Sequence, residues 1–480
     1  MLFNSLQFIW FFPLTTLLYF ALPHRIRWAW LLAASYWFYM SWRPQYGLLL
    51  AASTALAYGT GMMMESASPS RRKAWLLAGI SGNLAMLFFF KYFNFAAATA
   101  RSVSTRLGVD WPFPDPGILL PVGVSFFVFQ SLGYILDVHA GRIHAERHVG
   151  RFALFLAFFP QLVAGPIERA ENLLPQLRLR ASLLQEDAVT GLRLMLWGMF
   201  QKVVIADRLA LIVNPVYDNP TAHSGGALLT ATYFFAFQIF CDFSGYSLIA
   251  MGSAKVLGID LMANFRSPYF SASVAEFWKR WHISLSTWFR DYLYLPLGGN
   301  RVGRARWCMN ILIVFMISGL WHGANWTFVV WGALHGAYLL AGSMTRPLRS
   351  RFVAAMGLDG FPRMLRAAAI LFTFHIVLFA WIFFRARSMT DAWFIVSKIA
   401  GGGGFGSITA DLGQSVSTLA LSVALIILME VVHFFQSRRA GVLLPAGPSM
   451  ALRWAAYLAL LLAILNLRPA HPAPFIYFQF

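Results

Sequence analysis

The chain has 480 residues, of which 59% are hydrophobic and only 12% are charged, whereas about a quarter of the residues of a soluble protein of this length would be charged. Its formal net charge is +19, from 38 Lys and Arg against 19 Asp and Glu. Such an excess would suggest nucleic acid in a soluble protein, but here the basic residues lie mainly in short loops, where lipid headgroups and the positive-inside rule account for them. The composition therefore excludes a soluble nucleic-acid-binding protein and indicates a polytopic membrane protein in contact with lipid.

Apolar runs close to the twenty residues that cross a bilayer recur along the whole chain. They are continuous and do not alternate, so they predict helices and not barrel strands. In chain order the predicted spans lie near residues 5–22, 27–42, 46–64, 74–98, 118–138, 151–165, 188–213, 227–257, 308–340, 364–384, 414–435 and 451–467. We therefore expect an all-α polytopic membrane protein that forms a single integral-membrane domain over residues 1–480.

Three stretches depart from this regular pattern. Residues 308–340 are too long for one span, so we expect a bend or two pieces. The run 151–165 is short and ends at proline and glycine residues, which favours a re-entrant segment. The Pro- and Asp-rich stretch 101–116 is predicted to be a loop.

Loop charges suggest an orientation for the start of the chain. Arg71, Arg72 and Lys73 mark a cytoplasmic loop, and Arg25 with Arg27 mark another two loops earlier. The N-terminus would then lie outside and the first span would run inward.

The sequence predicts no metal site. Cys241 and Cys308, the only cysteines, lie in or beside apolar segments and support neither a disulfide framework nor a metal centre. Five titratable residues cluster after a predicted span: Asp137, His139, His144, Glu146 and His148. Their spacing is not that of a ligand set, so a solvated loop is favoured over a metal site.

The most informative stretch, residues 318–326, places His322 inside an apolar segment long enough to cross a bilayer. A titratable side chain at that depth persists only where it faces protein, a water-filled cavity or a substrate path. Glycines on both sides remove side-chain bulk, so we expect that a thin ligand can approach the ring closely. A packing histidine bonded to a neighbouring carbonyl is the alternative. Trp321 and Asn325 are candidate substrate-contacting residues beside it.

Residues 264–301 mix charged and aromatic residues too densely for a lipid-exposed span. One helix from about Ser273 would carry one face formed by Trp278, Trp281, Leu285 and Trp288. It would carry a polar face formed by Lys279, His282, Ser286 and Arg290. An interfacial amphipathic helix would explain the tryptophans and basic residues, but not the continuation of the polar stripe through His282 and Ser286. A helix that lines a polar cavity explains both, which makes the four polar residues candidates for a substrate tunnel.

Histidine is the side chain best suited to take and return a proton near neutral pH, so His282 and His322 are the candidate catalytic residues. His335 follows His322 by thirteen residues, about 20 Å along an unbroken helix, so these two cannot share one reaction centre unless the segment folds back.

A further polar island, residues 241–247, interrupts an otherwise apolar helix. Asp242 would be costly facing lipid and should pair with Arg, Lys or His inside the bundle. We favour a structural ion pair for Asp242, and the same for Asp291 next to Arg290. Asp242, Tyr246 and Asp291 remain candidates for the tunnel lining.

At these residues the sequence resembles the membrane-bound O-acyltransferase superfamily, specifically the bacterial branch of alginate O-acetylases and peptidoglycan O-acetyltransferases. The motifs that carry the resemblance span nearly the whole chain: FNSLQFIWFFP near the start, PVGVSFFVFQSLGYILDV at 121–138, FPQLVAGPIER at 159–169, CDFSGYS at 241–247, RWHISLSTWFRDYLYLPLGGNR at 280–301, SGLWHGANWTFVVWGALHG at 318–336 and the terminal FIYFQF. The pair RWHISLSTWFRDYLY and GLWHGA is the most specific part.

The resemblance implies about eleven transmembrane helices, with re-entrant and amphipathic helices, around a tunnel open to both sides of the membrane. It implies that His322 is the essential histidine and His282 the second site histidine. The donor would be a cytoplasmic acyl thioester, acetyl-CoA in this branch, with no bound cofactor. The acceptor would be an extracytoplasmic polysaccharide or a periplasmic O-acetyltransferase partner, and the protein would reside in the bacterial inner membrane. The related teichoic-acid D-alanylation proteins take their acyl group from a carrier protein instead, but the LPLGGNR and FIYFQF blocks favour the acetylase branch.

A transporter or flippase that moves acyl or polysaccharide material without making bonds is the alternative function. A polar tunnel with intramembrane His and Asp suits transport equally well from composition alone. The absence of inverted repeats and the specific histidine motifs favour the enzyme. Which polysaccharide is acetylated does not follow from the sequence.

Overall fold

The computed structural model describes residues 1–109, 117–163, 165–403, 408–438, 449–470 and 473–478. Within these ranges the chain is helical and contains no strand, which confirms the all-α prediction. The chain forms two compact units: unit 1 comprises Met1–Met195 and Tyr246–Met262, and unit 2 comprises Leu196–Gly245 and Ala263–Phe480. The expectation of a single domain remains a prediction.

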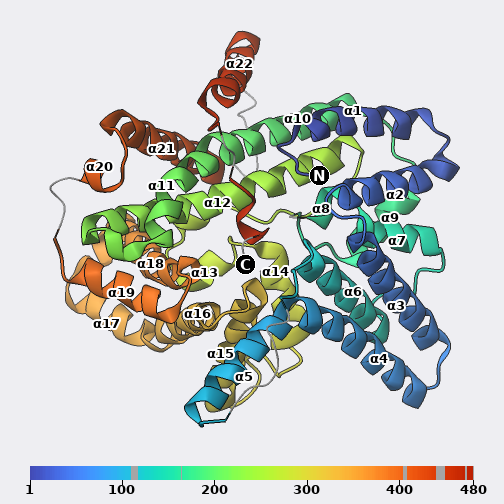
Figure 1. The fold of residues 1–480 in the computed structure, drawn as a ribbon, viewed down its shortest axis with the longest axis horizontal. Helices are drawn as coiled ribbons and strands as arrows, with labels where there is room; N and C mark the ends of the chain where they lie inside the picture. The colour runs from blue at the N-terminus through green and yellow to red at the C-terminus, as the bar shows by residue number, and fades with distance from the viewer. Residues whose placement is uncertain (110–116, 164, 404–407, 439–448, 471–472, 479–480) are drawn as a thin grey trace. The chain divides into compact units, whose positions relative to one another are not determined.

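Unit 1 holds the N-terminal helices (Figure 1). They are α1 (Leu6–Ala21), α2 (His24–Met40), α3 (Tyr46–Ser66), α4 (Pro69–Leu87), α5 (Phe93–Arg106), α6 (Val124–His139), α7 (Val149–Ala157), α8 (Phe159–Leu162) and α9 (Ala170–Arg178). α3, α4 and α6 pack against one another, and α2 packs against α7. α10 (Gln185–Met199) and α12 (Gly225–Val256) each contribute residues to both units.

Unit 2 contains the two candidate histidines. It also holds the helices that follow (Figure 1). They are α11 (Asp207–Asp218), α13 (Val274–Trp278), α14 (Ile283–Phe289), α15 (Arg304–His322), α16 (Trp326–Met344), α17 (Arg346–Ala355), α18 (Pro362–Arg385), α19 (Met389–Ala400), α20 (Ile408–Asp411), α21 (Val416–Arg438) and α22 (Met450–Leu467).

Eight helices within the described ranges are long and apolar enough to cross a membrane. They lie at Tyr46–Ser66, Pro69–Arg106, Gly225–Val256, Arg304–His322, Trp326–Met344, Pro362–Arg385, Val416–Gln436 and Met450–Leu467. α1 and α6 are apolar but shorter. The protein is therefore a multi-pass membrane protein, while the number eleven remains a prediction.

Two of the three irregular stretches of the sequence are broken into shorter helices. Residues 308–340 do form two pieces, α15 and α16. The run 151–165 is broken into the short helices α7 and α8, although its residue 164 lies outside the described ranges. The loop predicted at 101–116 begins later than expected, because α5 continues to Arg106; residues 110–116 are outside the described ranges.

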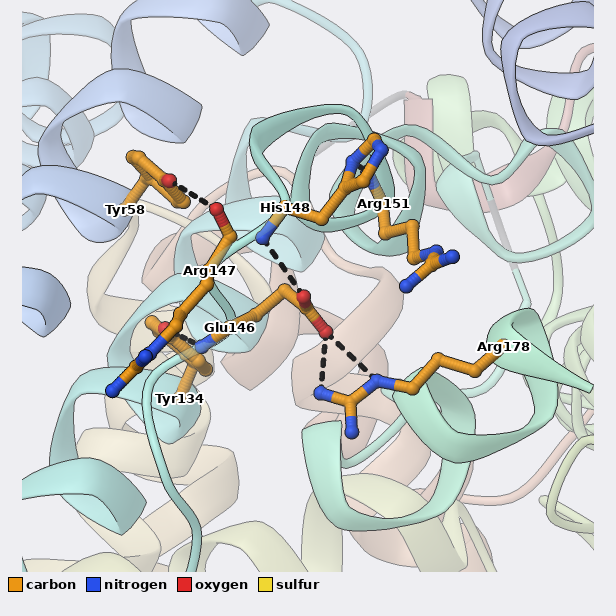
Figure 2. Close-up of polar contacts among 7 residues, drawn as sticks. All are labelled: Tyr58, Tyr134, Glu146, Arg147, His148, Arg151 and Arg178. Carbon is orange, nitrogen blue, oxygen red and sulfur yellow. Dashed lines mark hydrogen bonds and ion pairs between the residues drawn. The ribbon is translucent and has the colours of Figure 1, made fainter. Parts of the chain in front are cut away.

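The titratable cluster at the end of α6 is only in part the solvated loop that its spacing suggested, because the His144 side chain is exposed but two carboxylates are buried. Asp137 and Glu146 are 2% and 3% exposed. Arg142 pairs with Asp137 at 3.0 Å, and the Arg178 side chain pairs with Glu146, as Figure 2 shows. The local reason is burial: a carboxylate inside the unit needs a cationic partner, and arginine supplies it.

The hairpin of α15 and α16 depends on glycines that allow backbone contact. A Cβ added at Gly319 would lie 2.1 Å from the carbonyl oxygen of Phe328, and one added at Gly332 would lie 2.1 Å from that of Phe315. The two helices therefore pack with their backbones in contact, as small residues permit between membrane helices.

We predict that Gly319→Ala destabilises this hairpin, since the added methyl group forces the two backbones apart. Overpacking of this kind costs about 1–3 kcal/mol or more. Gly342→Ala is the matched control, because an added Cβ in the same α16 would meet nothing within 4 Å. Thermal unfolding of the detergent-solubilised protein should show a lowered midpoint temperature for Gly319→Ala and an unchanged one for Gly342→Ala. Equal midpoints for the two variants would contradict the packing argument.

Candidate active site

The structure brings the two candidate histidines together in unit 2. His322 is the last residue of α15, and His282 directly precedes α14. Their ring centroids lie 6.2 Å apart, and the residues are 2% and 0% exposed. Two imidazoles at this separation can act on one substrate group placed between or beside them.

Aromatic side chains from distant parts of unit 2 enclose the histidine pair. The Phe243 ring of α12 lies 4.6 Å from the His282 ring. The Tyr477 ring, near the C-terminus, lies 5.6 Å from the His322 ring, and the Trp331 ring of α16 lies 5.1 Å from it. The His322 ring therefore faces protein and not lipid, which is the condition under which a titratable side chain persists at membrane depth.

Several polar atoms of this enclosure have no hydrogen-bond partner among the described residues. These buried atoms are both ring nitrogens of His282, the Tyr477 hydroxyl and the Trp331 Nε1. Each such group costs roughly 1–3 kcal/mol. Buried polar groups without partners are rare in native proteins, and a ligand that supplies donors and acceptors would satisfy them. The site is therefore suited to a polar group such as a hydroxyl or a carbonyl.

Burial lowers the pKa of the His282 imidazole to about 3, because the charged ring would lose its hydration. His282 is therefore neutral at pH 7. A neutral imidazole keeps one N–H donor and one acceptor nitrogen. It can donate a hydrogen bond to a developing oxyanion without carrying a charge of its own.

The continuous helix predicted from Ser273 is wrong, and His282 is where it breaks. α13 ends at Trp278, and His282 has φ +43°, in the left-handed region, before α14 begins at Ile283. The Asn264 carbonyl accepts a hydrogen bond from the Ile283 N–H at 2.9 Å, and its side-chain oxygen accepts one from the Ser284 hydroxyl at 2.6 Å. These tertiary bonds hold a conformation that costs a non-glycine residue roughly 1–3 kcal/mol.

The break separates the residues predicted to share a polar face with His282. Lys279 and Arg290 are exposed. Arg290 Nε pairs with Asp291 at 2.7 Å, as expected for that carboxylate, and the Ser286 hydroxyl donates to the Trp281 carbonyl at 3.2 Å. The single polar stripe is therefore not formed, because α13 and α14 do not continue one another.

Asn325 and Tyr246 have structural bonds. The Asn325 side chain accepts from the Thr327 N–H at 3.0 Å, which caps α16, and donates to the Arg387 carbonyl at 3.0 Å. The Tyr246 hydroxyl, in unit 1, donates to Asn4 Oδ1 at 3.1 Å. Trp321, by contrast, lies beside both site histidines, 5.9 Å from the His282 ring and 5.0 Å from the His322 ring.

The glycines around His322 admit protein instead of a thin ligand, which corrects the sequence-based expectation. A Cβ added at Gly323 would lie 2.1 Å from the Phe328 ring, and that at Gly319 would meet the Phe328 carbonyl. The segment folds back after His322, so His335 does return towards the site. The Trp331 ring lies between this histidine and the catalytic candidate, 4.9 Å from the His335 ring and 5.1 Å from the His322 ring.

The prediction that Asp242 pairs inside the bundle is confirmed. Lys202 Nζ lies 2.6 Å from Asp242 Oδ1 and 2.7 Å from Asp207 Oδ1, and all three side chains are at most 3% exposed. Lys202 Nζ also donates to the Ala473 carbonyl at 3.1 Å, and Asp242 Oδ2 accepts from the Ile476 N–H at 2.7 Å. This charge cluster, Lys202–Asp207–Asp242, therefore fixes the segment that carries Tyr477.

Sequence reasoning missed four residues of this arrangement: Lys202, Asp207, Asn264 and Tyr477. In a sequence a buried lysine shows only as a charge within an apolar run. Lys202 is such a charge, but the run around it is long enough to be predicted as a span despite the lysine. The terminal FIYFQF block signalled Tyr477 only through its resemblance to a family motif.

The fold and the site together define the class of this protein: it is a helical multi-pass membrane protein with a buried histidine pair. The model of the MBOAT, membrane-bound O-acyltransferase, family matches residues 148–389. The chain is 37% identical over 516 residues to a probable alginate O-acetylase of Azotobacter vinelandii, with 100% of both chains covered. It is 33% identical to a peptidoglycan O-acetyltransferase of Helicobacter pylori, covering 84% of this chain and 80% of that one.

The chain therefore belongs to the membrane-bound O-acyltransferase family, and it is an O-acyltransferase. It is also 30% identical to a teichoic acid D-alanyltransferase of Streptococcus thermophilus over 57% of its length. The resemblance seen in the sequence is confirmed, including the bacterial O-acetyltransferase branch.

Proposed function

We propose that this protein transfers an acetyl group from cytoplasmic acetyl-CoA across the bacterial inner membrane to a hydroxyl of an extracytoplasmic polysaccharide, directly or through a periplasmic partner. The observation that carries the proposal is the buried pair of His282 and His322 in a family of O-acyltransferases. Beside it the His282 ring nitrogens and the Tyr477 hydroxyl have no hydrogen-bond partner among the described residues. The names of the relatives, which refer to alginate and peptidoglycan, support a polysaccharide acceptor.

In the proposed reaction His322 accepts the proton of the acceptor hydroxyl. The hydroxyl oxygen attacks the thioester carbonyl, the new C–O bond forms as the C–S bond breaks, and the proton passes to the leaving thiolate. General-base catalysis of this kind contributes about 10²–10⁴-fold. The neutral His282 donates its N–H to the carbonyl oxygen as negative charge develops there, an interaction that is often the larger contribution.

This role for His282 predicts a difference between two substitutions. His282→Gln keeps a neutral N–H donor, whereas His282→Leu removes it and leaves the oxyanion without a partner. We expect His282→Leu to lower the acyl-transfer rate by about 10²–10³-fold and His282→Gln to retain a larger fraction. The measurement is the rate of acetyl transfer by membranes with matched amounts of each variant. Equal rates for the two variants would contradict the donor role.

The test of the function uses acetyl-CoA that carries one label on the acetyl group and another on CoA. Membranes containing the protein should release labelled CoA and place labelled acetyl in base-labile esters on extracytoplasmic glycan. A transporter would instead move label without separating acetyl from CoA, and that outcome would overturn the proposal. Comparing ester content of glycans from cells with and without the protein identifies the polymer.

A further inference from the structure

Unit 1 contains a pocket of about 170 Å³, lined by residues of α1, α2, α7 and α9 and the turns beside them. Its basic residues are His24, Arg25, Arg27, His148 and Arg151. No acidic side chain belongs to the lining. A concave site with convergent cations and no carboxylate is suited to an anion.

Two helices begin at this pocket, held together by a glycine contact. A Cβ added at Gly150 of α7 would lie 2.0 Å from the Trp28 ring of α2, and the Trp28 ring lies 4.7 Å from the His148 ring. His24 and Arg25 are the first residues of α2, and Arg151 is in the first turn of α7. Neither helix has an acidic residue in its first turn. The positive ends of both helix dipoles therefore add to the basic side chains.

The basic residues divide into a structural group and a free group. The Arg27 guanidinium donates to the carbonyls of Leu22, Ala181 and Phe20 at 3.0, 2.7 and 3.1 Å, which ties α2 to its surroundings. Arg25 and Arg151 form no side-chain hydrogen bond or ion pair within the described part of the chain. In Figure 2 no dashed line reaches the Arg151 guanidinium, while Glu146 nearby is engaged by Arg178.

His148 adds a donor of fixed identity. Its Nδ1 accepts a hydrogen bond from the Arg151 N–H at 3.2 Å. Because that nitrogen is the acceptor, Nε2 carries the proton in the neutral ring and can donate. The free group, Arg25, Arg151 and His148, therefore offers donors whose acceptor is not provided by the described chain.

The rest of the lining is apolar. Four leucines, Leu31, Leu154, Leu177 and Leu179, join the rings of Tyr19 and Trp28. The pocket lies at the turn between α1 and α2, and the outer positions of α1, such as Leu14 and Leu17, are 57% and 69% exposed apolar side chains. A ligand with an anionic head and an apolar stem matches basic residues at the end of a helix with exposed apolar side chains.

We propose that this pocket binds the phosphate of an amphiphilic ligand, with Arg25 and Arg151 as the charge-carrying contacts and His148 as a further donor. Two sources share this chemistry: the headgroup of an anionic phospholipid and the phosphates of a soluble molecule such as CoA. The proposal does not depend on the reaction at the histidine pair.

The test measures thermal unfolding of the purified full-length protein in detergent, with phosphatidylglycerol, phosphatidylcholine, CoA or inorganic phosphate added, and counts bound lipid by native mass spectrometry. Binding should raise the midpoint by roughly 3–6 °C, by analogy with ligand-linked stabilisation of folded proteins. A rise with phosphatidylglycerol and not with phosphatidylcholine identifies the lipid source. A rise with CoA identifies the soluble source.

Paired variants distinguish binding at this pocket from a general effect of positive charge on the protein surface. Arg25→Gln with Arg151→Gln should abolish both the rise and the bound ligand, whereas Arg25→Lys with Arg151→Lys should retain much of each. Arg346→Gln with Arg351→Gln is the matched control, since both arginines are exposed on α17 and outside the pocket. The proposal is overturned if no ligand raises the midpoint, if the Arg25 and Arg151 double variant responds like wild type, or if the control loses the response equally.

Discussion

His322→Ala is expected to abolish O-acetylation while the protein still accumulates in the membrane. The His322 ring is buried beside the rings of His282, Tyr477 and Trp331, and in the proposed reaction it is the group that takes the proton. Loss of the general base alone lowers the rate by about 10²–10⁴-fold. Ester content of extracytoplasmic glycan from cells that produce the variant is the measurement.

A packing role must be separated from a catalytic one in that experiment. His322→Gln preserves much of the volume and keeps the turn after α15, but it cannot act as a base near neutral pH. It should therefore be as inactive as His322→Ala while unfolding close to the wild-type temperature. His375 provides a control position, since it is exposed and bonds Tyr233 at 2.7 Å, away from the pair. His375→Gln should retain activity; normal ester levels in either His322 variant would remove the catalytic assignment.

The second large effect is expected at the charge cluster Lys202–Asp207–Asp242. Lys202→Met leaves two buried carboxylates without their cation and removes the bond to the Ala473 carbonyl. Breaking a buried ion pair by removing one partner costs about 3–5 kcal/mol. We expect a strongly lowered unfolding temperature or loss of the protein from membranes.

Lys255→Met is the matched control for that variant. Lys255 also pairs with two carboxylates, Asp187 at 3.0 Å and Asp260 at 2.8 Å, but its side chain is 26% exposed. Ion pairs open to solvent contribute about 0–1 kcal/mol, so this variant should unfold close to wild type. Limited proteolysis near the C-terminus should follow the same order, because the cluster fixes the segment that carries Tyr477. Similar stability of the two variants would contradict this account of the cluster.

The sequence predicted the helices and the two histidines that the structure brings together, because apolar runs of span length and an intramembrane imidazole are local signals. The pairing of Asp242 followed from the cost of an unpaired charge, although its partner Lys202 did not. The break at His282 could not be predicted, because bonds from Asn264 select a conformation that local propensity opposes.

Tertiary placement explains the other differences. In the sequence Gly319 and Gly323 suggest space for a ligand, but the folded hairpin places Phe328 in that space. The approach of Tyr477 to His322 joins the chain's end to α15, and no periodicity encodes such a contact. The basic pocket could not be predicted for the same reason, since Arg25 and Arg151 are far apart in sequence.

In the proposed reaction the His322 imidazole takes the proton of the acceptor hydroxyl during acyl transfer. The most direct measurement compares wild-type and His322→Gln protein, purified in lipid and supplied with acetyl-CoA and acetylatable glycan, by the rate of CoA release. We expect CoA release that depends on the glycan for the wild-type protein and only background release for the variant. Equal, glycan-dependent release by both proteins would contradict it.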